Sequence, residues 1–123
     1  MYFIKKTRAR YSMFSDTYII KKALEIAQQS KYFMKHASIV VKRYQNKWRI
    51  VAIGFNEIVF RNGSLWSIHS EIAALRKVPK RKDKYVMFNV SISERGQVRN
   101  SKPCSKCAET LRKAGINCYH TTL

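Results

Sequence analysis

Residues 68–75 read Ile-His-Ser-Glu-Ile-Ala-Ala-Leu, and this stretch carries the clearest indication of the fold. Its apolar residues recur at helical spacing, so we predict a helix over about 69–77 that stops before Pro79. Residues 103–107 read Pro-Cys-Ser-Lys-Cys, and a second helix is predicted to begin at Cys104 or Ser105. That helix should end at Gly115, because glycine often terminates a helix.

The rest of the chain alternates between strand-like and helix-like segments. Ser15 or Asp16 can cap a further helix that runs to about Lys31. Runs rich in β-branched and aromatic residues predict strands, with turns at 45–46 and 62–64; the predicted strands cover residues 38–44, 47–53, 85–92 and 116–120. Strands that are joined through helices predict an α/β fold, a three-layer α/β/α sandwich with a mixed sheet. We expect one domain over residues 15–123, preceded by a basic N-terminal arm or edge segment over residues 1–14.

The composition is that of a folded protein. The chain has 123 residues, of which 46% are hydrophobic, and this suits a single globular domain. No apolar run approaches the ~20 residues that span a bilayer, so no membrane partner is expected. The charged N-terminus does not resemble a secretory signal, and three cysteines are a poor disulfide framework. We therefore expect an intracellular protein, cytoplasmic or, in a eukaryote, nuclear.

The net charge of the chain is strongly positive. Its 25 lysines and arginines against 7 acidic residues give a formal net charge of +18. Such an excess favours a polyanionic partner, most often nucleic acid; general solubility or a lysine-biased composition is the alternative explanation. Candidate nucleic-acid-binding residues are Lys80, Arg81, Lys82, Lys84, Arg99 and Lys106. Aromatic residues lie among the basic ones, and Trp66 is a candidate for stacking on a base. Many of the other aromatic residues are expected to pack in the hydrophobic core.

The residue types in the two quoted stretches are those of a metal site. His69, Cys104 and Cys107 offer three ligands of the kind that zinc prefers, and the two cysteines, three residues apart, share one face of a helix start. Three protein ligands leave a fourth position for water, whose pKa zinc can bring to about 7. Glu71 is an acid that is not needed as a ligand, so it could move the proton of that water.

A different set of ligands is also consistent with the sequence. Cys104, Cys107, Cys118 and His120 could form a closed structural site, which would leave His69 and Glu71 without a role. A redox-active pair of cysteines is a further alternative, and a buried position on a strand is the plainer interpretation of Cys118.

The pairing of His-x-Glu with Pro-Cys-x-x-Cys resembles the cytidine deaminase-like superfamily, over about residues 16–120. The resemblance implies hydrolytic deamination of a nucleobase, with Zn²⁺ held by His69, Cys104 and Cys107 and with Glu71 as the catalytic proton carrier. In the same way, Gly54-Phe55-Asn56 resembles a family turn, which implies that Asn56 contacts the substrate. The resemblance also implies that Ser70, Ser101, Lys102 and Pro103 lie beside the base.

The chain also departs from the family pattern. The family sheet normally has five strands, whereas only four are predicted here, and the chain ends just after the fourth. We therefore expect the last strand to be an unpaired edge, open to partner addition, which makes a homo-oligomer a possible partner arrangement.

Three substrates or roles remain open. The first is cytosine in single-stranded DNA or RNA, which the net charge favours. The second is a free nucleoside or nucleotide such as cytidine, deoxycytidine or deoxycytidine monophosphate. The third is a non-enzymatic nucleic-acid-binding domain with a structural zinc. Adenine is a further possible target, but related tRNA adenosine deaminases usually carry an acidic residue where this chain has Lys102, which favours cytosine.

Overall fold

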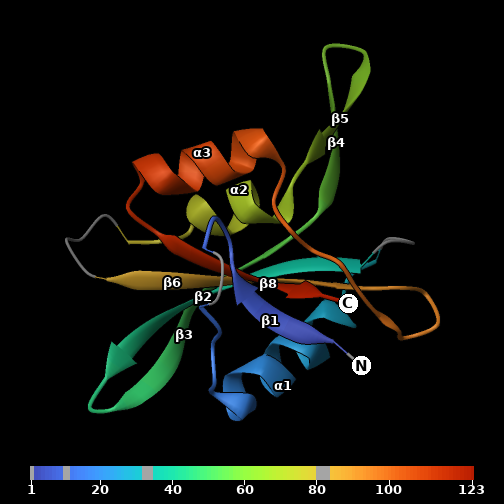
Figure 1. Cartoon of the computed structure of the whole chain (residues 1–123). Coiled ribbons are helices and arrows are strands. Elements are labelled where there is room, and N and C mark those ends of the chain that lie inside the picture. The colour runs from blue at the N-terminus through green and yellow to red at the C-terminus, as the bar shows by residue number, and fades with distance from the viewer. Residues whose placement is uncertain (1, 10–11, 32–34, 80–83) are drawn as a thin grey trace.

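A mixed β-sheet forms the centre of the molecule in the computed structural model, which describes residues 2–9, 12–31, 35–79 and 84–123 (Figure 1). Its strands follow the order β1-β8-β6-β2-β3, and the short β7 pairs with β6. β8 is parallel to β6, whereas the other neighbours are antiparallel. The strands of this sheet are β1 (Phe3–Lys6), β2 (Lys35–Tyr44), β3 (Lys47–Phe55), β6 (Tyr85–Ile92), β7 (Val98–Arg99) and β8 (Asn117–Thr122).

Helices cover both faces of this sheet. α1 (Thr17–Ala27) lies on one face, while α2 (Ser70–Leu75) and α3 (Ser105–Lys113) lie on the other (Figure 1). The predicted three-layer α/β architecture with a mixed sheet is therefore confirmed. Alternate residues of the central strands face opposite layers, as the period of two requires, so that Phe88 packs toward α1 and Met87 toward α2 and α3.

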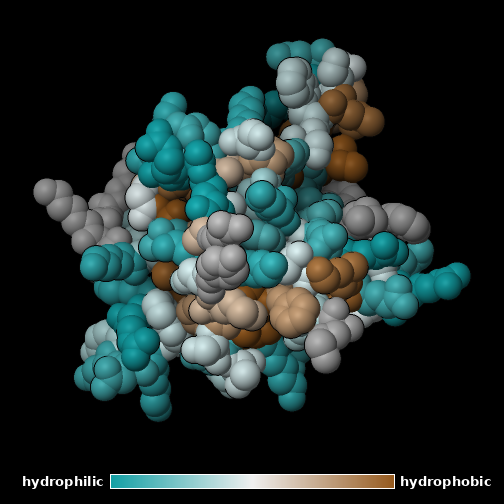
Figure 2. All heavy atoms as spheres, in the orientation of Figure 1, coloured by the Kyte–Doolittle hydropathy of each residue, from teal (hydrophilic) through white to brown (hydrophobic). Residues whose placement is uncertain are grey.

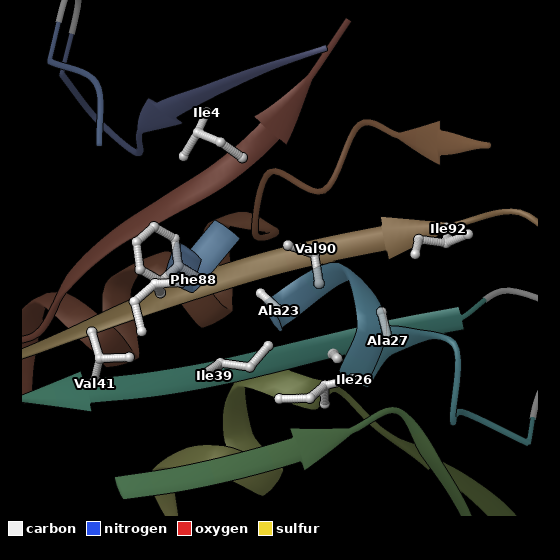
Figure 3. Packing of buried hydrophobic residues seen from close by; sticks show 11 residues of the cluster. Ile4, Ala23, Ile26, Ala27, Ile39, Val41, Phe88, Val90 and Ile92 are labelled. Carbon is white, nitrogen blue, oxygen red and sulfur yellow. The ribbon is translucent and has the colours of Figure 1, made fainter. Parts of the chain in front are cut away.

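The layer beside α1 holds the larger hydrophobic cluster. Ile19, Ala23 and Ile26 of α1 pack on the apolar side chains of β2 and β6, among them Ile39 and Phe88 (Figure 3). The side chain of Asp16 caps the helix, since its Oδ1 accepts a hydrogen bond of 3.1 Å from the backbone N–H of Ile19. α1 ends at Ala27, earlier than the predicted Lys31.

The predicted hairpin between β2 and β3 is present. Gln45 and Asn46 join the strands with positive φ angles of 48° and 65°, which suits the right-handed twist of a tight hairpin. The structure also contains a second hairpin, of which the sequence analysis predicted the turn but not the two strands. It consists of β4 (Glu57–Arg61) and β5 (Ser64–Ile68), joined by Asn62 and Gly63, and it projects from the body of the molecule (Figure 1).

The N-terminal segment belongs to the sheet. β1 pairs antiparallel with β8, and Ile4 is buried while its neighbours Phe3 and Lys5 are exposed. The prediction that the last strand has an unpaired edge is therefore wrong, because the alternation around Ile4 lets residues 3–6 cover that edge. Phe14 also packs on the core, with its ring centroid 4.2 Å from that of Phe88.

Gly54 sets the distance between β3 and α2. A Cβ atom at this position would lie 2.5 Å from the carbonyl oxygen of Ser70 and closer still to the backbone nitrogen of Ala74. Only glycine allows the first turn of α2 to approach the sheet so closely, and this approach positions the residues at the start of α2. Among the described helices, none is both long and apolar enough to cross a membrane.

Candidate zinc site

His69 and Cys104 occupy equivalent positions at the starts of two helices. His69 is the N-cap residue of α2 and Cys104 is the N-cap residue of α3, and both have extended backbone angles. Neither side chain bonds to the backbone of its own helix, so both can point toward a shared ligand. Cys107 lies three residues further along α3 and is buried, whereas His69 and Cys104 are exposed.

The three side chains meet at distances that suit a metal ion. Nδ1 of His69 lies 3.7 Å from Sγ of Cys104 and 3.3 Å from Sγ of Cys107, and all three ligand atoms lie within 4.8 Å of one another. Ligands at about 2.3 Å (sulfur) and about 2.1 Å (nitrogen) from tetrahedral zinc lie about 3.6 Å apart. The donor set and its spacing therefore fit Zn²⁺, which is the metal of this site.

The alternative closed site does not form. Cys118 is buried in the hydrophobic cluster beside α3, where burial raises the pKa of its thiol to about 12. Nδ1 of His120 forms a hydrogen bond of 2.7 Å with Oγ1 of Thr7. In the described part of the chain, His69, Cys104 and Cys107 are the one group of three or more metal-ligating residues that could hold an ion.

The protein environment favours the neutral thiol of Cys107. Burial, followed by the nearby carboxylate of Glu71 and the Cys104 side chain, raises the pKa of the Cys107 thiol to about 12. Because zinc binds the thiolate, zinc binding must displace the proton from this group.

Glu71 lies beside the ligand group without belonging to it. Its side chain is only 5% exposed, and Oε1 accepts a hydrogen bond of 2.9 Å from Oγ of Ser70. Glu71 lines the same cavity as His69 and Cys104. Its role as a proton carrier stays a prediction.

A buried polar network holds Glu71 and connects it to the loop before α3. Oγ of Ser38 on β2 lies 2.8 Å from Oγ of Ser70 and donates a hydrogen bond of 2.7 Å to Oδ1 of Asn89 on β6. Asn89 in turn donates from Nδ2 to the carbonyl oxygen of Ser101 at 2.5 Å, and Oγ of Ser101 donates to the carbonyl oxygen of Asn89 at 2.5 Å. The network thus links the segments that carry the two halves of the zinc site.

A cavity of about 380 Å³ opens beside the ligand group. Its walls combine polar side chains from both sheet and helices, namely His36, Asn56, Ser67, His69, Ser70, Glu71, Asn89, Asn100, Ser101, Lys102 and Cys104. Oδ1 of Asn56 accepts hydrogen bonds of 3.1 Å from the Ser30 hydroxyl and from the His36 backbone N–H, which fix the orientation of its amide.

Most of the predicted substrate-binding residues meet at this cavity. Asn56, Ser70, Ser101 and Lys102 line it. Pro103 is buried beside Cys104 and is not part of the lining, and Trp66 is 59% exposed on β5, outside it.

The predicted nucleic-acid-binding residues are more scattered. Lys106 lines a neighbouring cavity of about 240 Å³, together with Arg76 and the three zinc ligands. Lys84 and Arg99 are exposed but line neither of these two cavities. Lys80, Arg81 and Lys82 lie outside the described residues.

The sequence analysis did not identify several residues of the cavity. Asn89 is a polar residue inside a buried apolar strand, and this contrast could have marked it. His36 was missed because only the fold brings β2 to the site. Burial lowers the pKa of its imidazole, with Glu71 acting in the opposite direction and His69 in the same direction.

Comparison with known proteins identifies a family. The family model of the cytidine and deoxycytidylate deaminase zinc-binding region matches residues 13–121. No curated protein and no solved structure matched the chain significantly. The match covers α1, α2, α3 and the strands of the sheet other than β1 and the last residue of β8, and it includes the three zinc ligands and Glu71. The chain therefore belongs to the family of proteins that carry the cytidine and deoxycytidylate deaminase zinc-binding region.

Proposed function

We propose that this protein hydrolytically deaminates cytosine to uracil in single-stranded DNA or RNA. The observation that carries the proposal is the position of Glu71, a buried carboxylate that lines the cavity beside His69, Cys104 and Cys107. Family membership supports zinc-dependent deamination in general, and the choice of a polymeric substrate is our inference from charge.

The chemistry follows from the residues of the site. His69, Cys104 and Cys107 would hold Zn²⁺, and the bound ion would supply a Lewis acid that brings the pKa of water to near neutral. Glu71 would carry the first proton of the water to the ring nitrogen, and would then carry the second proton, from the hydroxyl added to the ring, to the departing amine. Water adds its oxygen to the carbon that loses ammonia, so no oxidant or further reactant is needed. The hydroxyl of Ser70 holds the Glu71 carboxylate in place at 2.9 Å.

Electrostatics supports a polyanionic substrate. At least two of the seven acidic residues are already paired with basic side chains in the folded protein. Glu109 pairs with Arg112 at 2.6 Å and with Arg8 at 3.3 Å, and Glu25 lies 3.8 Å from Lys22. Lys102 lines the main cavity, and Arg76 and Lys106 line the neighbouring one. A strand of phosphates that passed the cavity would therefore meet a cationic surface.

The size of the cavity favours a second candidate function, the deamination of a free nucleoside or nucleotide. A volume of about 380 Å³ lies at the lower end of the range typical of small-molecule sites. Such a cavity could also receive one base of a strand whose neighbours remain outside, and the net charge of +18 then favours the strand.

Direct comparison of substrates tests the proposal. Zinc-loaded protein is incubated with cytosine-containing single strands of DNA and RNA, and separately with cytidine, deoxycytidine and deoxycytidine monophosphate. We expect uracil in the strands and a steep loss of activity as salt concentration rises, because phosphate contacts release counterions. Activity on free nucleotides alone, insensitive to salt, would contradict the polymer proposal. Strand binding without any deamination would indicate the non-enzymatic alternative.

A further inference from the structure

The β4–β5 hairpin presents an apolar face to solvent. In its register Phe60 is opposite Leu65 and Ile58 is opposite Ser67, so these four side chains share one face of the two-stranded ribbon. Phe60 is 70% exposed, Leu65 73% and Ile58 53%. Apolar side chains gather on one side of the projecting hairpin in the space-filling view (Figure 2). So concentrated an exposed set of large apolar residues indicates a binding surface.

This apolar face begins at the rim of the zinc site. Ser67, which shares the face, lines both the main cavity and the neighbouring cavity. His69 follows two residues later in the chain and is one of the zinc ligands. A molecule that entered the main cavity and continued along the hairpin would therefore pass from Ser67 to Phe60 and Leu65.

Positive charge borders the base of the hairpin. Arg76 and Lys106 line the cavity that Ser67 and Ile68 also line. The occupant of this region should therefore combine negative groups near the rim with flat apolar groups further out. A single-stranded nucleic acid has this combination, because its phosphates alternate with bases that stack on apolar and aromatic side chains. A second copy of the chain is disfavoured, because each copy carries a net charge of +18.

We propose that the apolar face formed by Phe60 and Leu65 binds the base of a nucleotide that flanks the target cytosine. The phosphate that connects this nucleotide to the target lies toward Arg76 and Lys106. This proposal rests on the proposed function, since it assumes a strand whose target base occupies the main cavity. It also assigns the hairpin to recognition of the strand rather than to the reaction itself.

Binding measurements on single strands test the proposal. The zinc-loaded chain of 123 residues carries Glu71→Gln so that a labelled, cytosine-containing strand stays intact, and binding is followed by fluorescence anisotropy. Loss of one stacked base weakens binding by a factor of about 5 to 150. We expect a decrease of this size for Phe60→Ala and a larger one when Leu65→Ala is added. Tyr18→Ala is the matched control, because Tyr18 is an aromatic residue 71% exposed on α1, across the sheet from the zinc site.

The possible outcomes separate this proposal from the proposed function. If the wild-type protein deaminates strands and the Glu71→Gln protein binds them, but Phe60→Ala and Leu65→Ala leave that binding as tight as before, the hairpin proposal is overturned and the proposed function stands. A loss confined to Trp66→Ala would assign the opposite face of the hairpin and overturn the proposal as well. If Phe60→Ala instead converts a dimer to a monomer in sedimentation without affecting strand binding, the face is an interface between copies. Both proposals would be overturned if the wild-type protein did not deaminate strands and the Glu71→Gln protein did not bind them.

Discussion

Oγ of Ser70 donates a hydrogen bond of 2.9 Å to Oε1 of Glu71, and both side chains are buried. The same hydroxyl lies 2.8 Å from Oγ of Ser38, which is itself bonded to Asn89. The carboxylate that we assign to proton transfer is thus held by a network that crosses from α2 to two central strands. Precise positioning of this kind is what a proton-transferring group requires.

Two buried serines on the same face of the sheet test the importance of this network. Ser38 belongs to it, whereas Oγ of Ser91 has no hydrogen-bond partner among the described residues. Ser38→Ala should lower the free energy of unfolding by about 1–3 kcal/mol, because it leaves buried partners unsatisfied. Ser91→Ala should be neutral or stabilising. Denaturant unfolding of the two variants checks this, and an equal loss of stability in both would contradict the network's role.

Removal of single zinc ligands tests the composition of the metal site. His69→Ala, Cys104→Ala and Cys107→Ala should each lose bound zinc, measured as metal content after dialysis, because each removes one of three ligands. Cys118→Ala serves as the control, since Cys118 is buried in the core and away from the ligand group. Retention of zinc by His69→Ala combined with its loss from Cys118→Ala would favour the closed site instead.

Substitution of Gly54 tests how α2 is positioned. In Gly54→Ala the new Cβ meets the backbone of Ser70 and Ala74, which cannot give way without moving α2. We expect a destabilisation of about 1–3 kcal/mol from overpacking, together with weakened zinc binding because His69 begins the same helix. Gly63→Ala is a suitable comparison, because a Cβ there has nothing within 4 Å and only its φ of 77° causes strain. If Gly54→Ala bound zinc as tightly as the wild type, the position of His69 would not depend on the close approach of α2 to Gly54.

The zinc ligands and Glu71 could be predicted from sequence because they lie in short motifs whose residue types and spacing are set by metal chemistry. The first hairpin and the buried strand over residues 85–92 were also predictable, since they are long, apolar and bounded by turn residues. Each of these features depends on residues that lie close together in the sequence, so the sequence alone is enough to predict it.

The features that escaped prediction depend on contacts between distant segments. Ser38, Ser70 and Asn89 come from three elements and form a network only once the sheet has assembled. The pairing of β1 with β8 joins the two ends of the chain, and a four-residue strand with one buried apolar residue gives little local signal. The β4–β5 hairpin was missed for a related reason: its large apolar side chains are exposed, so they do not follow the half-buried pattern of a strand in a sheet.

Hydrolytic deamination of cytosine, with Glu71 as the proton carrier beside zinc held by His69, Cys104 and Cys107, is the activity that we propose for this site. The most direct test is mass spectrometry of a cytosine-containing single strand after incubation with zinc-loaded wild-type protein and with zinc-loaded Glu71→Gln. The account predicts conversion to uracil by the wild type and a loss of rate by a factor of about 100 to 10,000 in the variant, with its zinc content unchanged. Equal rates in the two fully zinc-loaded proteins, or no uracil from either, would contradict it.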